Sequence, residues 1–298
     1  MANDLKKSEA WASVMQSQLE QAFVGKFIAD TKFEGLFEGN KTVHFKRQAK
    51  IQYFDMATSY AEIPLSNITQ VDETFTLSTR KGFAVAVSDE DYKEIDISPD
   101  SQIMRDAVEQ AAKLYDTAIM QNYVNAGLTI TDSALETASN GGGTNAIIAS
   151  KTNIYDILTA VEEKLDTAPD SLGNPTGVPD SNRWVVFSPK EKRLLSKAPE
   201  LLRSTDLGDK TVTGGFMGEI NGLKIYWSNN LVTSGSKYAL FGQGKPICFG
   251  ALMKPKVEFV GSETQAQSFV NTMKSQTYYG TKVFSEGAER LGSIKLSS

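Results

Sequence analysis

The 298-residue sequence predicts an α+β fold, and three patterns lead to that prediction. Apolar residues recur at helical spacing in several separate segments. Residues 42–87 instead alternate apolar and polar side chains, which is the period of a strand. The run WVVF at residues 184–187 is suited to a buried strand and is flanked by helical segments. This succession of helix, loop, buried strand and helix is α+β in character.

The first two elements are a helix and a long hairpin. Residues 5–27 place Met15, Leu19 and Phe23 on one face of an amphipathic helix, whose apolar stripe needs a cover. Residues 42–87 follow as a long hairpin broken by turns. An isolated two-stranded hairpin is only marginally stable in water, so this one must lie on another surface. A neighbouring subunit must supply that surface if the chain's own domain does not.

The strongest helix signal covers residues 99–126. Ser98 is a good N-cap, Pro99 fits the first helical position, and Gly127 is suited to the C-cap. Such a helix would be about 40 Å long, and we interpret it as a structural strut.

The middle of the chain alternates loops with regular elements. Residues 127–150 are polar and end in SNGGGTN, which indicates a flexible connection. A second helix is expected from Ile154 to Leu165. After the buried strand at 184–187, Ser188 and Glu191 form a capping box that begins another helix.

The stretch GGFMGEINGLKIYWSNNL at residues 214–231 tests whether the chain binds nucleotides. A phosphate-binding loop requires a helix after its glycines, because the helix N-terminus provides free N–H groups. Here an alternating strand follows instead. Asn221-Gly222 between two extended runs predicts a hairpin with a type I′ turn, so we expect no phosphate site.

Composition limits the possible chemistry. The net charge is −5 with acids and bases interspersed, so tight wrapping of nucleic acid is not expected. No apolar run is long enough to span a membrane, and the N-terminus does not have the pattern of a signal peptide. His44 is the only histidine and Cys248 is the only cysteine of the sequence. We interpret His44 as a half-exposed strand residue. We therefore predict no catalytic residues, no metal site and no cofactor. Carboxylate pairs, for example within Asp89–Asp91, leave a carboxylate hydrolase open as an alternative.

Several segments, in order, resemble the major capsid proteins of tailed bacteriophages, whose fold is shared with the herpesvirus capsid floor. The similar stretches are EAWASVMQSQLEQAFVGKFIAD, FEGLFEGNKTVHFKR, ITQVDETFTLSTRKGFAVAVSDEDYKEID, DAVEQAAKLYDTAIM, WVVFSPKEKRLL, GEINGLKIYWSNNL and SQTYYGTKVFSEGAERLGSIKL. Their ordered succession, and not any single motif, is the basis of the resemblance.

The resemblance implies a division of the chain. It comprises an N-terminal arm and helix at 1–36 and an extended β-hairpin loop at 37–88. A peripheral domain follows at 89–128 and 254–298 with a spine helix at 99–126, and an axial domain occupies 129–253. No extra N-terminal segment of the kind that acts as a built-in scaffold precedes the arm, so any scaffold is expected to be a separate protein.

The implied function is structural. Homo-hexamers and homo-pentamers would form an icosahedral shell around phage double-stranded DNA, without sequence-specific DNA binding and without a membrane. A portal protein is an expected partner, together with a separate scaffolding protein and a decoration protein. The location would be the virion capsid, after synthesis and assembly in the cytoplasm of a bacterial host. The alternative of the same class is a cellular compartment shell of the encapsulin type, which encloses an enzyme.

Candidate contacts between subunits lie in the hairpin. Polar and charged side chains there are candidates for ion pairs, with a solvated surface as the alternative. Aromatic side chains are candidates for buried contacts, because aromatic residues are enriched at the centres of interfaces. These candidates are Arg47, Lys50, Tyr53, Phe54, Asp55, Tyr60 and Glu62. Asn221 and Gly222 form the predicted turn of the axial hairpin.

Overall fold

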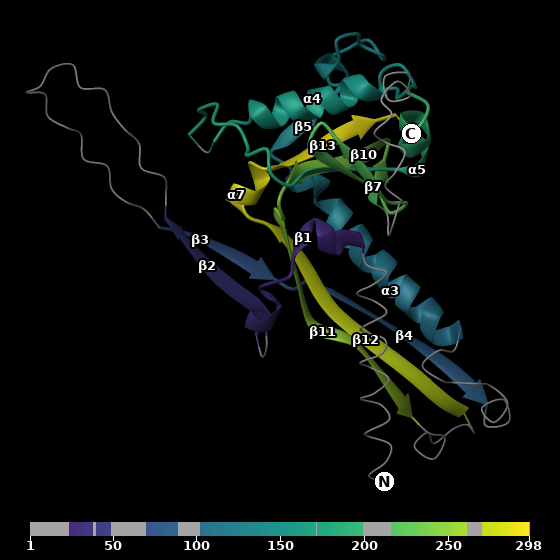
Figure 1. Cartoon of the computed structure of the whole chain (residues 1–298). Coiled ribbons are helices and arrows are strands. Elements are labelled where there is room, and N and C mark those ends of the chain that lie inside the picture. The colour runs from purple at the N-terminus through teal and green to yellow at the C-terminus, as the bar shows by residue number, and fades with distance from the viewer. Residues whose placement is uncertain are drawn as a thin grey trace, which may run out of the picture.

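The structure is a computed structural model that describes residues 24–37, 40–48, 70–88, 102–170, 172–198, 216–260 and 270–297. These residues form a four-stranded sheet, a seven-stranded sheet and a separate two-stranded sheet, with helices against the two larger sheets (Figure 1). The predicted α+β class is confirmed. Most of the helix predicted at 5–27 lies outside the described residues, and Val24–Phe27 form the short 3-10 helix η1.

The four-stranded sheet has the order β1 (Ala29–Asp30), β11 (Ile247–Val260), β12 (Val270–Val283), β4 (Thr79–Ser88). The helix α3 (Gln102–Met120) runs along this sheet (Figure 1). Tyr115 on α3 contacts the rings of Phe249 and Tyr279, and its hydroxyl forms a hydrogen bond with Thr277 on β12. Buried aromatic packing therefore fixes α3 to the two long central strands.

The predicted hairpin over 42–87 is only partly correct. β2 (Thr42–Gln48) and β3 (Gln70–Thr76) pair with each other as an antiparallel hairpin. β4 does not continue this hairpin, because it pairs along its whole length with β12. Residues 79–88 are therefore part of the four-stranded sheet and not of the hairpin. The prediction differs here because alternation predicts a half-buried strand but does not specify the partner strand.

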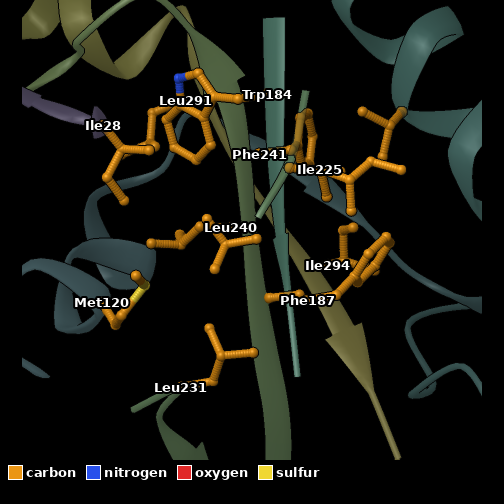
Figure 2. Packing of buried hydrophobic residues seen from close by; sticks show 14 of the residues in the cluster. Ile28, Met120, Trp184, Phe187, Ile225, Leu231, Leu240, Phe241, Leu291 and Ile294 are labelled. Carbon is orange, nitrogen blue, oxygen red and sulfur yellow. The ribbon is translucent and has the colours of Figure 1, made fainter. Parts of the chain in front are cut away.

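The seven-stranded sheet has the order β5 (Leu128–Ile130), β13 (Leu291–Leu296), β10 (Ser236–Gln243), β6 (Arg183–Phe187), β8 (Leu223–Trp227), β7 (Phe216–Ile220), with β9 (Thr233–Ser234) beside β10. Helices α4 (Ile154–Asp166) and α5 (Pro189–Leu195) place buried side chains in the same hydrophobic core as this sheet. Successive residues of β10 point to opposite faces: Leu240 lies toward Met120, and Phe241 lies toward Ile225 (Figure 2). The sheet is thus buried on both faces.

The predicted boundary at residue 253 does not separate the two larger sheets. β11 already begins at Ile247 in the four-stranded sheet. At the C-terminal end, the chain passes through α7 (Ser285–Ala288) and enters the seven-stranded sheet as β13. Gly292 makes this placement possible, because a Cβ atom there would collide with the ring of Phe241 on β10. Residues 291–296 are therefore part of the seven-stranded sheet.

The spine helix predicted at 99–126 is largely correct. α3 is followed directly by the 3-10 helix η3 (Gln121–Asn125), and residues 99–101 lie outside the described residues. Asn122 donates its side-chain amide to the carbonyl oxygens of Ala118 and Ile119, which satisfies the end of the helix. Within the described residues, no helix is sufficiently long and apolar to cross a bilayer.

The loop at 131–150 is more ordered than its composition predicts. Asp132 begins the short 3-10 helix η4 (Asp132–Ala134), and its side chain is fully buried. The carboxylate accepts hydrogen bonds from the backbone N–H of Ser139, Asn140 and Gly142 and from the Ser139 hydroxyl. The glycines of SNGGGTN take positive φ values, which allows the loop to close around this carboxylate.

Candidate assembly surfaces

The β2–β3 hairpin leaves the rest of the molecule as a two-stranded sheet (Figure 1). Its two faces differ in character. One face is polar and exposed, and there Thr42 contacts Thr76 while His44 contacts Asp72 at 3.0 Å (Nδ1 to Oδ2). His44 is therefore an exposed cross-strand partner. The other face carries Phe45 and Phe75 near the body of the molecule, and further out it carries Val71, which is exposed.

The base of the hairpin packs into a second hydrophobic core. Phe75 lies edge-on to Phe37 with ring centroids 4.9 Å apart, and Phe45 lies at the same distance from Phe284. Gly250 and Gly280 allow this close packing, because a Cβ atom at Gly250 would lie 2.7 Å from the Phe37 ring. The buried members of this core are Phe37, Phe75, Leu77 and Cys248.

A group of polar contacts holds the same base to α7. Glu73 on β3 accepts hydrogen bonds from the backbone N–H of Ser285 at 3.2 Å and from its hydroxyl at 2.6 Å. Arg47 on β2 lies between two carboxylates, with its Nε 3.4 Å from Glu73 and a terminal nitrogen 3.9 Å from Glu286. Arg47, a candidate contact between subunits, thus has its ion pairs within its own chain.

The other candidate contacts of the hairpin are not placed by the structure. Lys50, Tyr53, Phe54, Asp55, Tyr60 and Glu62 all lie outside the described residues, in the segment that joins β2 to β3. They remain predictions. The described part of the hairpin does establish where this segment begins and ends, because Gln48 and Gln70 are directly opposite each other in the register of the two strands.

A second junction joins α3 to the N-terminal segment. The buried carboxylate of Asp116 on α3 accepts a hydrogen bond from the backbone N–H of Gly25 at 2.8 Å and another from the side-chain amide of Asn230 at 3.3 Å. Phe27 stacks on Tyr226 of β8 with centroids 5.5 Å apart. The N-terminal segment therefore enters the described structure between α3 and the seven-stranded sheet. Sequence reasoning missed this role of Asp116, because periodicity does not identify a buried polar joint.

The turn at Asn221 and Gly222 joins β7 to β8 as an antiparallel pair. Both residues have positive φ, +50° and +78°, which is the geometry of the expected turn. The Asn221 amide donates to the Tyr155 hydroxyl on α4 at 3.0 Å. Burial raises the pKa of Glu162 on α4, although Arg183 opposes this rise. The turn at Asn221 and Gly222 is thus followed by the strand β8, and it contacts the helix α4.

The described residues contain no group of three or more His, Cys, Asp or Glu side chains that could hold a metal ion. Cys248 is buried in the second core, and burial, together with the nearby Asp30, raises the pKa of its thiol to about 12. A thiol with so high a pKa is a poor nucleophile at neutral pH. The residues described so far take part in packing and in contacts between elements of the chain.

Comparisons with known protein families and solved structures show what this chain is similar to. A family model described as phage capsid protein matches residues 70–290. No curated protein matches the sequence. Among solved structures, a chain of Mycobacterium phage Che8 has 17% identity and a TM-score of 0.70, with 91% of this chain and 90% of that chain covered.

Two further solved structures are similar to this chain. The mature capsid of bacteriophage PhiM1 gives 16% identity and a TM-score of 0.59, covering 91% of this chain and 89% of that one. A virus-like particle from Pyrococcus furiosus gives 11% identity and a TM-score of 0.57, covering 96% and 98%. These similarities, all at low identity, extend over nearly the whole chain.

Proposed function

This chain belongs to the phage capsid protein family, and on that premise we propose that its β2–β3 hairpin is the clasp by which neighbouring subunits join. The protein is a structural major capsid protein with the tailed-phage capsid fold. The single observation that supports the clasp is the contrast along the hairpin. Its base is fixed to the body by rings and by Glu73, whereas Val71 on the same face, further out, is exposed.

The clasp has a simple physical basis. A two-stranded sheet is marginally stable alone, and burial of the outer part of this face, where Val71 is exposed, against a second copy stabilises both partners. Subunits that join head to tail form a closed ring when the rotation from one subunit to the next is a whole fraction of a full turn. In this proposal, hexamers and pentamers form in this way, and many modest contacts acting together make dissociation of the shell slow. Lys50, Tyr53, Phe54, Asp55, Tyr60 and Glu62 are the proposed contacts of the clasp.

The proposal also assigns the two larger sheets. The four-stranded sheet with α3 forms the peripheral part, and the seven-stranded sheet with the Asn221-Gly222 turn forms the axial part near the ring centre. Residues 1–36 are the predicted arm; because residues 29–30 pair with β11 of the same chain, the proposed contact with a further subunit falls to the part of the arm before residue 24. These assignments adjust the predicted boundaries so that residues 79–88 are peripheral and residues 291–296 are axial, in line with their sheets.

The shell in this proposal encloses double-stranded DNA and acts without enzymatic activity. The net charge of −5 suits an inner surface that does not grip DNA, since the genome must enter and later leave. Portal, scaffolding and decoration proteins are the proposed partners, with assembly in the cytoplasm of the host. The likeness to the virus-like particle from Pyrococcus furiosus is the observation behind the second candidate, a cellular compartment of the encapsulin type.

The clasp is tested by shortening the hairpin. Because Gln48 and Gln70 are paired, residues 49–69 are replaced by Asn-Gly, which closes the two strands with a tight turn and keeps the base intact. The expected product is a soluble, folded subunit that no longer forms rings or shells in electron microscopy and sedimentation velocity. The control replaces residues 49–69 by a Gly/Ser segment of equal length, which should also fail to assemble. Shells formed by either variant would show that the hairpin is not the clasp.

A further inference from the structure

The turn between β7 and β8 contains a pair of residues with a reactivity of its own. Asparagine is a thermolabile residue, because the backbone nitrogen of the next residue can attack its side-chain amide, and a glycine in that next place has no side chain to hinder the attack. Asn221 and Gly222 are both exposed. Apart from its chain neighbours, nothing lies within 4 Å of the place where a Cβ atom of Gly222 would be. Water therefore has access to both reacting groups at this turn.

The backbone nitrogen of Gly222 is not part of the hydrogen-bonded ladder. The antiparallel pairing of β7 with β8 ends with Ile220 opposite Leu223. In a two-residue turn, only the residues that flank the turn exchange backbone hydrogen bonds. The Gly222 nitrogen can therefore lose its proton without breaking a bond between the two strands.

The side chain of Asn221 is held on α4. Its Nδ2 donates a hydrogen bond to the hydroxyl oxygen of Tyr155 at 3.0 Å. Burial raises the pKa of Glu162, and a hydrogen bond from the Asn221 side chain opposes this rise, so the same side chain also contacts that carboxylate. An attack by the Gly222 nitrogen requires the Asn221 side chain to rotate back toward its own backbone. The contacts with α4 therefore keep the amide carbon away from the nitrogen.

We propose that Asn221 is a site of spontaneous deamidation, which the contacts of its side chain with α4 restrain. In the first step, the Gly222 nitrogen loses its proton to solvent and forms a bond to Cγ of Asn221. The bond from Cγ to Nδ2 breaks, and Nδ2 takes up a proton from solvent and leaves as ammonia. The product is a cyclic succinimide. In the second step, water adds to either carbonyl carbon of the succinimide, and the ring opens to aspartate or isoaspartate.

Both products weaken the contact between the turn and α4. A carboxylate at residue 221 has no N–H to donate to Glu162, and the two negative charges repel each other. In isoaspartate the main chain passes through the side-chain carbons, which lengthens a turn that has only two residues. Because the released ammonia is lost to solvent, modified chains accumulate as the protein ages. This inference concerns the chain itself and is independent of the proposed shell function.

The first test measures the reaction in the purified full-length chain. The protein is incubated in mildly alkaline buffer, and the fraction modified at residue 221 is followed by peptide mass spectrometry. Tyr155→Phe removes the acceptor for Nδ2 of Asn221 and should speed the reaction there roughly fivefold, the factor expected from the loss of one neutral hydrogen bond. The pair Asn140-Gly141 of the same chain is the matched control. Its asparagine side chain donates to the carbonyl oxygen of Ala146, so Tyr155→Phe should leave its rate unchanged.

The second test uses the product side chain. Asn221→Asp should speed amide hydrogen exchange in β7 and β8 roughly threefold, because the hairpin is held less firmly on α4. The same substitution in a Glu162→Gln background should have no such effect, since the opposing carboxylate is then absent. An equal effect in both backgrounds would overturn the role of Glu162.

Three outcomes of the first test would overturn the proposal. An unchanged rate at residue 221 in Tyr155→Phe, or an equal acceleration at Asn140, would show that α4 does not restrain the reaction. A folded chain that stays unmodified at residue 221 in both the parent and Tyr155→Phe, after complete conversion of the chain unfolded in urea, would show that the folded protein has no such site. Neither readout depends on whether shells form.

Discussion

At the residue scale, Asp132 shows how one buried carboxylate organises a loop that is rich in glycine. Burial by itself would raise the pKa of this group. Hydrogen bonds from the Ser139 hydroxyl and from the backbone N–H groups of Gly142, Asn140 and Ser139 outweigh that effect and lower the pKa from 3.8 to about 2. The charged form therefore fits the folded loop better than the protonated form does.

This low pKa predicts a pH dependence of stability. Because the folded-state pKa lies below the unfolded value, Asp132 stabilises the fold fully above about pH 4, and this contribution is lost as the pH falls toward about 2. Asp132→Asn should lower the free energy of unfolding at pH 7 by about 2 kcal/mol and remove this part of the acid sensitivity. Both effects are measured by urea unfolding of the free subunit between about pH 2 and about pH 7. Glu136→Gln, at an exposed acid of the same loop, is the control, and an equal loss there would contradict the assignment to Asp132.

The turn glycine Gly222 permits a second test at this scale. Its φ of +78° disfavours any residue with a Cβ atom, although nothing lies within 4 Å of the place where that atom would be. Gly222→Ala should therefore cost about 1 kcal/mol through the backbone alone. Gly35→Ala is a matched control, because that site is equally open and has no positive φ. Thermal unfolding of both variants gives the comparison, and equal stabilities would argue against the backbone explanation.

At the scale of the element, the base of the hairpin is a local joint between β3 and α7. Glu73→Ala removes the acceptor for Ser285 and the nearer partner of Arg47. We expect faster amide hydrogen exchange in β2 and β3 with little change in the seven-stranded sheet, because the hydrogen bonds and the ion pair of Glu73 are confined to the base. Asp72→Ala is the control, since its contact with His44 is exposed and contributes less than about 0.5 kcal/mol. Equally fast exchange throughout the molecule in Glu73→Ala would show that the joint is not local.

Sequence reasoning succeeded for elements whose signals are local. The capping box at Ser188 and Glu191 is present at the start of α5, and α4 covers the predicted residues 154–165. Sequence reasoning failed where an element depends on a distant partner. The alternating pattern of 79–88 could not show that β12 lies beside it, and the polar segment after Gly127 did not show that Asp132 orders it. The contacts proposed for Lys50 to Glu62 depend on a second chain, which the pattern of one chain does not specify.

At the scale of the whole molecule, the two larger sheets share one hydrophobic core. Leu240 in the seven-stranded sheet and Phe249 and Tyr279 in the four-stranded sheet belong to the same cluster of buried residues. The chain also passes directly from β12 in the four-stranded sheet through α7 to β13 in the seven-stranded sheet. The two larger sheets are therefore expected to unfold together.

Calorimetry of the variant with the shortened hairpin tests this coupling on free subunits. One transition is expected, with equal calorimetric and van't Hoff enthalpies. Leu240→Ala should move that whole transition to a lower temperature, with a cost of about 2–5 kcal/mol, because it leaves a cavity in the shared core. Two transitions, of which Leu240→Ala shifts only one, would show that the parts are thermodynamically separate.

The stiffness of the hairpin base has a mechanical consequence. β2 rises roughly 20 Å from Thr42 to Gln48, so the hairpin is a lever whose fulcrum is the cluster of rings around Phe75. A tilt of roughly 5° at the fulcrum displaces the far end of that lever by roughly 2 Å. The packed rings and the contacts of Glu73 thus determine how far the hairpin can tilt relative to the body of the molecule. In the proposed clasp, an error in the curvature of a growing shell would begin at this fulcrum, far from the surface where two subunits touch.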